Sequence, residues 1–206
     1  MPSIKRYLQA VKDCFTTIEI RDSSVKTKFY GLNLNPEVLI QLQNFANYYP
    51  TFDLEQLNRL PEESLGYAYA QHMNQKGIQS LEVSIDIAKK RKSNVFALRY
   101  TATHDIFHVL LDFDTSYAGE MGVFGFAVGQ NYSKFLKIVE PLILLFCCII
   151  KPHQIRKIWE CDRLGKALGK QAECLLAYRF EENWARPIDD VRAELRLTSN
   201  SSRIID

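Results

Sequence analysis

The chain has 206 residues, of which 47% are hydrophobic and 12% aromatic. A chain of this length can bury a core of ordinary size, and no linker, repeat or low-complexity tract divides it, so we predict one domain over residues 1–206. Lysine and arginine together number 26, against 24 aspartate and glutamate residues. The net charge of +2 supplies no field that would favour nucleic acid as a partner.

The cysteines and the longest apolar run bear on where the protein works. Five cysteines are an odd number, and no apolar leader stands near Met1, so we expect a cytoplasmic protein without a signal peptide or a disulfide framework. The longest apolar run, residues 142–150, is shorter than the ~18 residues that a membrane span needs. It predicts a buried core helix, with a dimer contact or a membrane contact as the alternatives.

Helical periodicity dominates the chain, and we predict an all-α fold, an irregular helical bundle. The turn-rich stretch 112–116 supplies cap candidates for the helix that follows it. Strand signals are weak, and the best of them lies at 81–85. In chain order, the predicted helices cover 4–11, a segment starting at Pro36 with Asn35 as its cap, 60–77, 94–111, a segment starting near Tyr117, 135–150 with Pro141 kinking or dividing it, 152–168, 170–184 and 187–197.

Two histidines on the predicted helix 94–111 are candidate metal ligands. His104 and His108 are four residues apart, so they lie one turn apart on the same face of a helix. Glu120 would face away on a continuous helix, but the turn at 112–116 allows a helical hairpin that brings it back to the histidines. Imidazole and carboxylate ligands suit Zn²⁺ first, with Mg²⁺, Mn²⁺ or Fe²⁺ as alternatives, and three protein ligands leave a position open for water or substrate. We therefore predict a metal site between two consecutive helices.

Asp105 has three alternative roles beside these ligands. It can be a fourth ligand, a partner that orients an imidazole, or a proton carrier in catalysis. A zinc protease has Glu after the first histidine, whereas this chain has the shorter Asp105, so a peptidase is the weaker interpretation. The competing interpretation is that the two histidines belong to an ordinary helix. His72 and His153 stand alone, and we interpret both as structural.

Small residues recur at three- and four-residue steps directly after Glu120. Such spacing leaves one helix face bare, which allows close approach by another helix or by a slender apolar chain. Helix packing is the commoner cause of this pattern by itself. Beside a metal site, a pocket for a lipid tail lined by Gly122, Gly125 and Phe126 becomes a credible alternative.

Three ordered elements resemble the coenzyme Q biosynthesis protein 4 family. The run His104-Asp105-Ile106-Phe107-His108, followed after eleven residues by Glu120, resembles the family's metal motif. The stretch 60–66 with Tyr69 is similar to an upstream Leu-Pro-x-x-Ser/Thr-Leu-Gly element. The C-terminal residues that resemble the family pattern are Glu181, Trp184, Arg192 and Leu195. The resemblance is strongest over residues 60–197, and we expect a bacterial-type homologue.

The resemblance implies a metal-dependent protein that handles polyprenylated quinone precursors at a membrane surface, together with other quinone-biosynthesis proteins. It also implies ligation by His104, Asp105, His108 and Glu120, and removal of the C1 carboxylate of the aromatic head coupled to hydroxylation. Our leading hypothesis is such an oxidative decarboxylase, peripheral to the membrane and homo-oligomeric. A non-catalytic isoprenoid-lipid-binding scaffold and a metal-dependent hydrolase are the alternatives.

Overall fold

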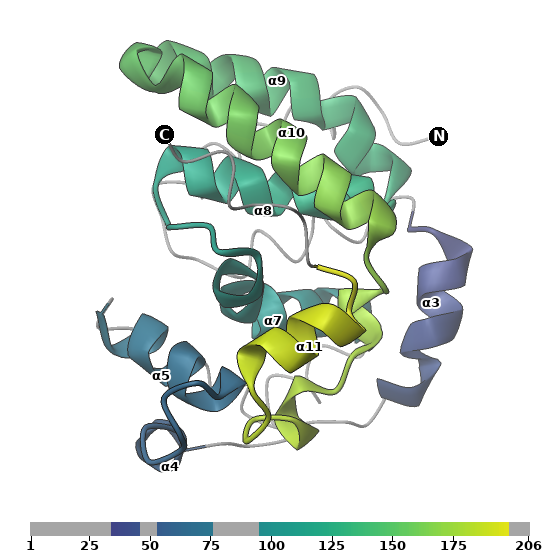
Figure 1. Cartoon of the computed structure of the whole chain (residues 1–206). Coiled ribbons are helices and arrows are strands. Elements are labelled where there is room, and N and C mark those ends of the chain that lie inside the picture. The colour runs from purple at the N-terminus through teal and green to yellow at the C-terminus, as the bar shows by residue number, and fades with distance from the viewer. Residues whose placement is uncertain (1–33, 46–52, 76–94, 198–206) are drawn as a thin grey trace.

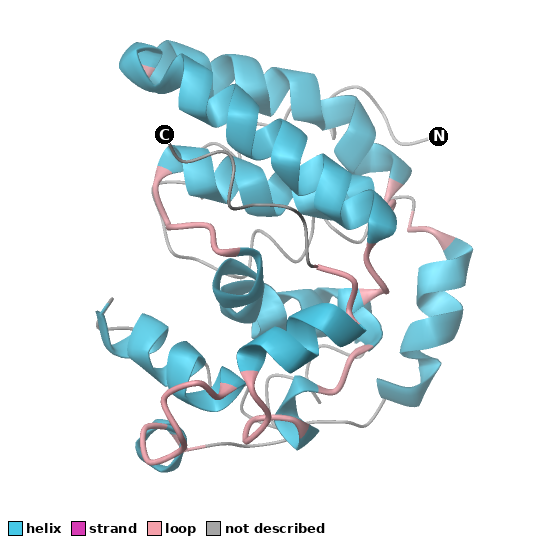
Figure 2. Ribbon diagram, viewed as in Figure 1, coloured by secondary structure: helices cyan, strands magenta, loops and turns pink. Residues whose placement is uncertain are grey.

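The computed structural model describes residues 34–45, 53–75 and 95–197. Within these ranges every regular element is an α-helix or a 3₁₀ helix, and the β-type contacts are two isolated antiparallel bridges. Figure 2 shows these helices joined by loops. The all-α prediction is therefore confirmed. The helix predicted at 4–11 and the strand candidate at 81–85 lie outside the described residues.

The helices pack around α7 and α8, which are consecutive in the chain. Helices α9 and α10 form a hairpin at one edge of the molecule, α8 lies against it, and α7, α5 and α11 lie on the other side of α8 (Figure 1). The bounds are α3 (Pro36–Leu42), η1 (Gln43–Phe45), α4 (Leu54–Leu57), α5 (Leu65–Gln75), α7 (Val95–Leu111), α8 (Tyr117–Gly129), α9 (Lys134–Ile150), η2 (Pro152–Gln154), α10 (Ile155–Gln171), η3 (Leu175–Ala177), η4 (Phe180–Glu182) and α11 (Ile188–Glu194).

Local capping explains where several helices begin. Asn35 caps α3 as predicted, since its side chain accepts a hydrogen bond from the Glu37 N–H at 3.1 Å. Helix α5 begins at Leu65, later than the predicted residue 60. The cause is Ser64, whose hydroxyl accepts from the Tyr67 N–H at 3.2 Å and donates to the Pro61 carbonyl at 2.6 Å.

A short turn joins α7 to α8 and changes the direction of the chain (Figure 1). The Phe113 N–H donates to the His108 carbonyl at 3.1 Å, and Asp112 between them adopts a φ of 57°, the left-handed conformation that ends many helices. Ser116 then caps α8 by accepting from the Gly119 N–H at 3.3 Å. The predicted turn, the predicted start of the next helix and the place of Glu120 in its first turn are all confirmed.

Helices α8 and α10 pack so closely that their backbones are in contact, along a seam formed by Gly122, Gly125 and Gly129 of α8 and Gly165 and Gly169 of α10. A methyl group added at Gly165 would lie 2.0 Å from the Gly122 carbonyl oxygen, and one at Gly125 would lie 2.5 Å from the Asp162 carbonyl oxygen. Gly129 and Gly169 meet the opposite helix in the same way. A Cβ atom is therefore excluded along this seam, and glycine is required because of packing.

This seam corrects the prediction of a lipid-tail pocket at Gly122, Gly125 and Phe126. The position of a Cβ atom at Gly122 is 2.7 Å from the Phe113 ring, Gly125 contacts α10, and Phe126 is completely buried. A helix face lined by small residues can accept either another helix or a slender apolar chain, and here it accepts helix α10. The space beside these residues is filled by the protein's own atoms.

The helix predicted at 170–184 is wrong. Helix α10 continues to Gln171, and the chain then makes only the two short 3₁₀ helices η3 and η4. The reason is the buried guanidinium of Arg99, which donates to the carbonyls of Leu176 and Tyr178 and pairs with Glu181. These carbonyls face a side chain from α7, so they do not accept from the N–H groups of a following helical turn.

Helix α9 is amphipathic, and only one of its faces belongs to the core. Ile143, Leu144 and Cys147 are buried as predicted for residues 142–150, but Leu145 and Ile149 are 59% and 68% exposed. The helix runs through Pro141 without dividing. None of the described helices is both long enough and apolar enough to cross a bilayer.

We predict that Gly165→Ala destabilises the fold by about 1–3 kcal/mol, because the added methyl group meets the α8 backbone. Urea unfolding followed by circular dichroism measures the change. The control is Ala167→Leu, which adds side-chain atoms at an exposed position of the same helix and should change the free energy of unfolding by less than about 0.5 kcal/mol. Equal stability of wild type and Gly165→Ala would show that the seam can open.

Candidate metal centre

His104 and His108 lie one turn apart on α7, as their spacing predicts. Their ring centroids are 4.9 Å apart, and the planes are inclined by 67°. The His108 side chain is fully buried, and that of His104 is 13% exposed. Both rings therefore reach the same buried region beside the first turn of α8.

Glu120 completes a group of three. Its Oε2 atom lies 3.7 Å from His104 Nε2, and its Oε1 atom lies 3.5 Å from His108 Nε2. Each of the three residues offers a ligand atom, and these atoms all lie within 4.8 Å of one another. Two ligands of a tetrahedral Zn²⁺ ion, each about 2.1 Å from it, are about 3.4 Å apart. The two histidine–glutamate separations, 3.7 and 3.5 Å, are close to this value, so an ion can fit between these ligand atoms.

A backbone carbonyl orients the buried imidazole. His108 Nδ1 lies 3.0 Å from the Phe113 carbonyl oxygen, which can only accept, so Nδ1 carries a hydrogen, and in the neutral ring Nε2 carries the lone pair that a metal ion needs. Among the described residues, His108 Nε2 has no hydrogen-bond partner. A buried acceptor atom without a hydrogen-bond donor lowers the stability of the fold unless another group binds to its lone pair. A metal ion bound between the three ligand atoms would occupy the lone pair of His108 Nε2.

Asp105 lies outside this group of three and faces α5. Its Oδ1 atom is 3.7 Å from His72 Nε2, and its side chain is 22% exposed. Burial, the largest single influence, raises the pKa of Asp105, but the side-chain contact with His72 and the electrostatic influence of His104, His108 and His72 outweigh it, so the pKa lies below its ordinary value. Asp105 is therefore ionised near neutral pH.

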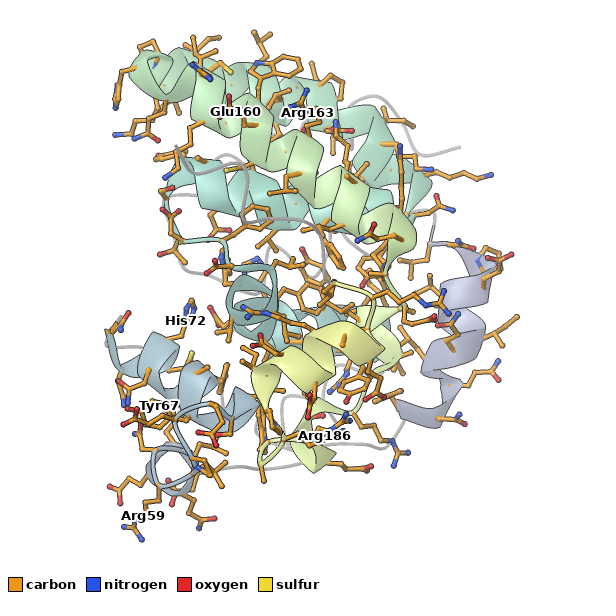
Figure 3. All side chains as sticks on the ribbon, in the orientation of Figure 1. Arg59, Tyr67, His72, Glu160, Arg163 and Arg186 are labelled. Atoms are coloured by element: carbon orange, nitrogen blue, oxygen red, sulfur yellow. The ribbon has the colours of Figure 1, made fainter. Side chains whose placement is uncertain are left out.

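His72 was interpreted from the sequence as structural, and the structure places it beside the candidate site. Figure 3 shows it on the side of α5 that faces α7. Its ring stacks on that of His108, with centroids 5.8 Å apart and planes inclined by 24°. No local pattern links α5 to α7, so sequence reasoning missed this neighbour. His153 is exposed on η2.

The C-terminal residues that resemble the family pattern hold the helix that carries the histidines. Arg192 donates from Nε to the Leu110 carbonyl and from Nη2 to the Val109 carbonyl, both at 3.0 Å. These are carbonyls of the last turn of α7, which lack N–H donor partners within the helix. Trp184 stacks on Tyr69 of α5 with centroids 5.2 Å apart. Burial, with smaller contributions from Asp105 and Glu181, raises the pKa of Tyr69, which stays protonated.

Fold and geometry together define an all-helical protein with a candidate metal centre between two consecutive helices. Residues 48–201 match the family model described as Coenzyme Q (ubiquinone) biosynthesis protein Coq4. Because this match covers most of the chain, the chain belongs to the Coq4 family. The resemblance seen in the sequence is thereby confirmed.

Several known proteins are similar to this chain. Two are named ubiquinone biosynthesis protein COQ4 homolog, mitochondrial: one from Danio rerio, 24% identical over 155 residues, and one from Drosophila pseudoobscura pseudoobscura, 27% identical over 152 residues. These matches cover 71% and 70% of this chain, which spans about half (54%) of the length of each relative. The crystal structure of a protein from Nostoc punctiforme, assigned to ubiquinone biosynthesis, shares the fold with a TM-score of 0.67. It is 22% identical, and the alignment covers 94% of this chain and 95% of that one.

We predict that the purified chain retains about one Zn²⁺ ion per molecule after dialysis, and that His108→Ala and Glu120→Ala lose it, because each removes one of three converging ligands. Native mass spectrometry with elemental analysis measures the metal content. His153→Ala, at an exposed histidine outside the group, is the matched control and should keep the ion. Unchanged metal content in the two ligand variants would refute the site.

Proposed function

We propose that this chain holds a divalent metal ion through His104, His108 and Glu120 and acts beside that ion on a polyprenylated aromatic precursor of ubiquinone. The observation that carries the proposal is the convergence of three ligand atoms that includes the buried Nε2 atom of His108. Membership of the Coq4 family supports the link to ubiquinone biosynthesis. Zn²⁺ suits two imidazoles and a carboxylate best, and Mg²⁺, Mn²⁺ and Fe²⁺ are the alternatives.

The proposed reaction replaces the C1 carboxylate of the aromatic head by a hydroxyl group. The C1–carboxyl bond breaks and the carboxyl group leaves as carbon dioxide, while a hydroxyl oxygen from water is added at the same carbon. This is a two-electron oxidation, and dioxygen as the external oxidant takes up the two electrons and two protons and leaves as hydrogen peroxide. When bound, the ion would supply a Lewis acid that stabilises negative charge on the substrate carboxylate. The substrate would occupy the position that three protein ligands leave open.

The chain's own residues orient the ligands and accept a proton. The Phe113 carbonyl holds the His108 ring with Nε2 toward Glu120. Asp105 is ionised near neutral pH, since its neighbours lower its pKa, so it can accept a proton from the substrate. Its carboxylate lies beside the ligand group and outside it, which suits a proton carrier better than a ligand.

We predict that the metal-loaded chain converts a polyprenyl hydroxybenzoate in detergent micelles under air, with loss of its carboxylate, and that His108→Ala lowers the rate by at least about 100-fold. Asp105→Asn should lower the rate while the metal stays bound, because it removes the proton acceptor and leaves the three ligands in place. Mass spectrometry of the extracted quinone precursor measures the reaction. His153→Ala serves as the matched control and should react as the wild type does.

The same assay separates the competing functions. Binding of the precursor without loss of the carboxylate would establish a lipid-binding scaffold in place of an enzyme. Hydrolysis of tail-less esters or phosphates, with no lipid extracted from the purified chain, would establish a hydrolase. Either result overturns the proposed decarboxylation.

The exposed face of the α9–α10 hairpin supports a peripheral membrane contact. Four exposed aliphatic residues recur along α9 at helical spacing, and Ile155 and Trp159 of α10 are 42% and 54% exposed. Lys134 and Lys137 are exposed in the first turns of α9. An apolar helix face with a tryptophan and adjacent cations suits the interface of an anionic membrane. The four residues of α9 are Ile138, Leu142, Leu145 and Ile149.

We predict that the chain floats with vesicles containing phosphatidylserine and that Ile149→Glu weakens this binding, because a charge replaces a residue that would enter the interface. The matched control is Ile40→Glu on α3, which changes an isoleucine of similar exposure, 63% against 68%. One result would refute the membrane contact: the wild type does not bind vesicles, and it forms a dimer that Ile149→Glu dissociates. A second copy of the chain would then cover this face.

A further inference from the structure

A largely buried ionic cluster joins α9 to α10, which lie side by side (Figure 1). Lys166 of α10 donates to the Glu140 carboxylate of α9, and its Nζ atom lies 2.7 Å from Oδ2 of Asp162, one turn earlier on α10. The Asp162 side chain is only 1% exposed, and that of Glu140 is 13% exposed. Two carboxylates from neighbouring helices thus share one ammonium group.

Asp162 is the member of this cluster with too few partners. Its Oδ1 atom has no hydrogen-bond donor among the described residues. The same atom lies 3.0 Å from the place that a Cβ atom of Gly125 would occupy, so the α8 helix covers it. A buried anionic oxygen without a donor destabilises the fold, and the nearby charge of Glu140 adds repulsion.

The helices that pack around Asp162 supply no further partner for its charge. Helix α8 carries titratable side chains only at Tyr117 and Glu120, near its start, and it meets α10 through glycines. Besides Glu140, the charged residues of α9 are Lys134 and Lys137, and both are exposed. The charge of Asp162 is therefore balanced within the cluster or not at all.

The cluster carries one negative charge too many. With both carboxylates ionised and Lys166 protonated, its net charge is that of a single anion. Burial raises the pKa of Asp162 most, the contact with Lys166 lowers it and Glu140 raises it again, so that this pKa lies above its ordinary value. One added proton would remove the net charge, and it would let one carboxyl group donate to the other.

We propose that Glu140, Asp162 and Lys166 form a proton-linked contact between α9 and α10: the two carboxylates take up one proton as the pH falls, and α9 is then held more firmly. The sign follows from proton linkage. A carboxyl group that binds its proton more tightly in the folded chain adds stability at low pH, and this stability is lost as the pH rises through its folded pKa. The inference goes beyond the proposed reaction and needs no metal ion.

The contact acts on the helix whose exposed face we propose to bind a membrane. The surface of an anionic membrane has a potential of about −30 mV, which raises the local proton concentration about threefold. Helix α9 would therefore be held most firmly when the chain lies at such a surface. This consequence rests on the proposed membrane contact, and absence of vesicle binding would overturn the consequence without touching the proton-linked contact itself.

Hydrogen exchange of the backbone amides of α9, measured by mass spectrometry at about pH 5.5 and about pH 7.5, tests the proposal in solution. Variants are compared with the wild type at the same pH, so the intrinsic effect of pH on exchange cancels. Asp162→Asn removes the titrating group and keeps its shape. The matched control is Glu62→Gln, which removes an exposed carboxylate distant from the hairpin.

The expected pattern follows from the excess charge. At about pH 7.5, Asp162→Asn should slow the exchange of α9 by at least about threefold, because the variant lacks that charge. At about pH 5.5 the difference should fall to less than about half, since the wild type is then protonated. Glu140→Gln should act in the same direction and decides the test if Asp162→Asn does not fold, and Glu62→Gln should match the wild type at both pH values.

Three results would overturn the inference. Equal exchange of α9 in the wild type and in Asp162→Asn at the higher pH would show that the charge does not loosen this helix. A difference of the same size at both pH values would show that no proton is taken up between them. An equal change in the exchange of α7 and α9 would show that the cluster has a purely structural role in the whole fold.

Discussion

The close contact between α8 and α10 is the constraint on which the candidate site depends. Glycines on both helices let backbone atoms meet, so α8 has one well-defined place against the α9–α10 hairpin. Phe113 of the preceding turn fills the space beside Gly122, and its carbonyl orients His108. The packing that holds α8 therefore also sets the position of Glu120 and the direction of the His108 ring.

Helix α7 is held from its other side by arginines that satisfy backbone carbonyls. Arg99 of α7 engages the irregular segment after α10, and Arg192 of α11 closes the last turn of α7. Each of these buried or half-buried guanidinium groups is removed from water and donates hydrogen bonds to several protein acceptors instead. The described part of the C-terminal segment, up to Leu197, thus adds no residue to the group of three candidate ligands, yet it helps to determine where the two histidines lie.

Local patterns predicted the parts of the fold that local interactions determine. Helical spacing placed His104 and His108 on one face, and the polar turn before Tyr117 placed Glu120 opposite them. The helix predicted at 170–184 failed because Arg99, distant in the sequence, takes the carbonyls that such a helix would use. The neighbour His72 was missed for the same reason, since only the packing of α5 against α7 brings it to Asp105. The glycine pattern after Glu120 was compatible with a neighbouring helix and with a lipid tail, and only the structure showed that α10 packs against it.

The central claim is that one ion binds where α7 and α8 meet, and anomalous X-ray diffraction from crystals of the zinc-loaded chain tests it most directly. We expect a single zinc peak about 2.0–2.2 Å from His104 Nε2, His108 Nε2 and a Glu120 oxygen. A zinc peak held by other residues, or no peak between these three side chains in fully loaded crystals, would contradict the account.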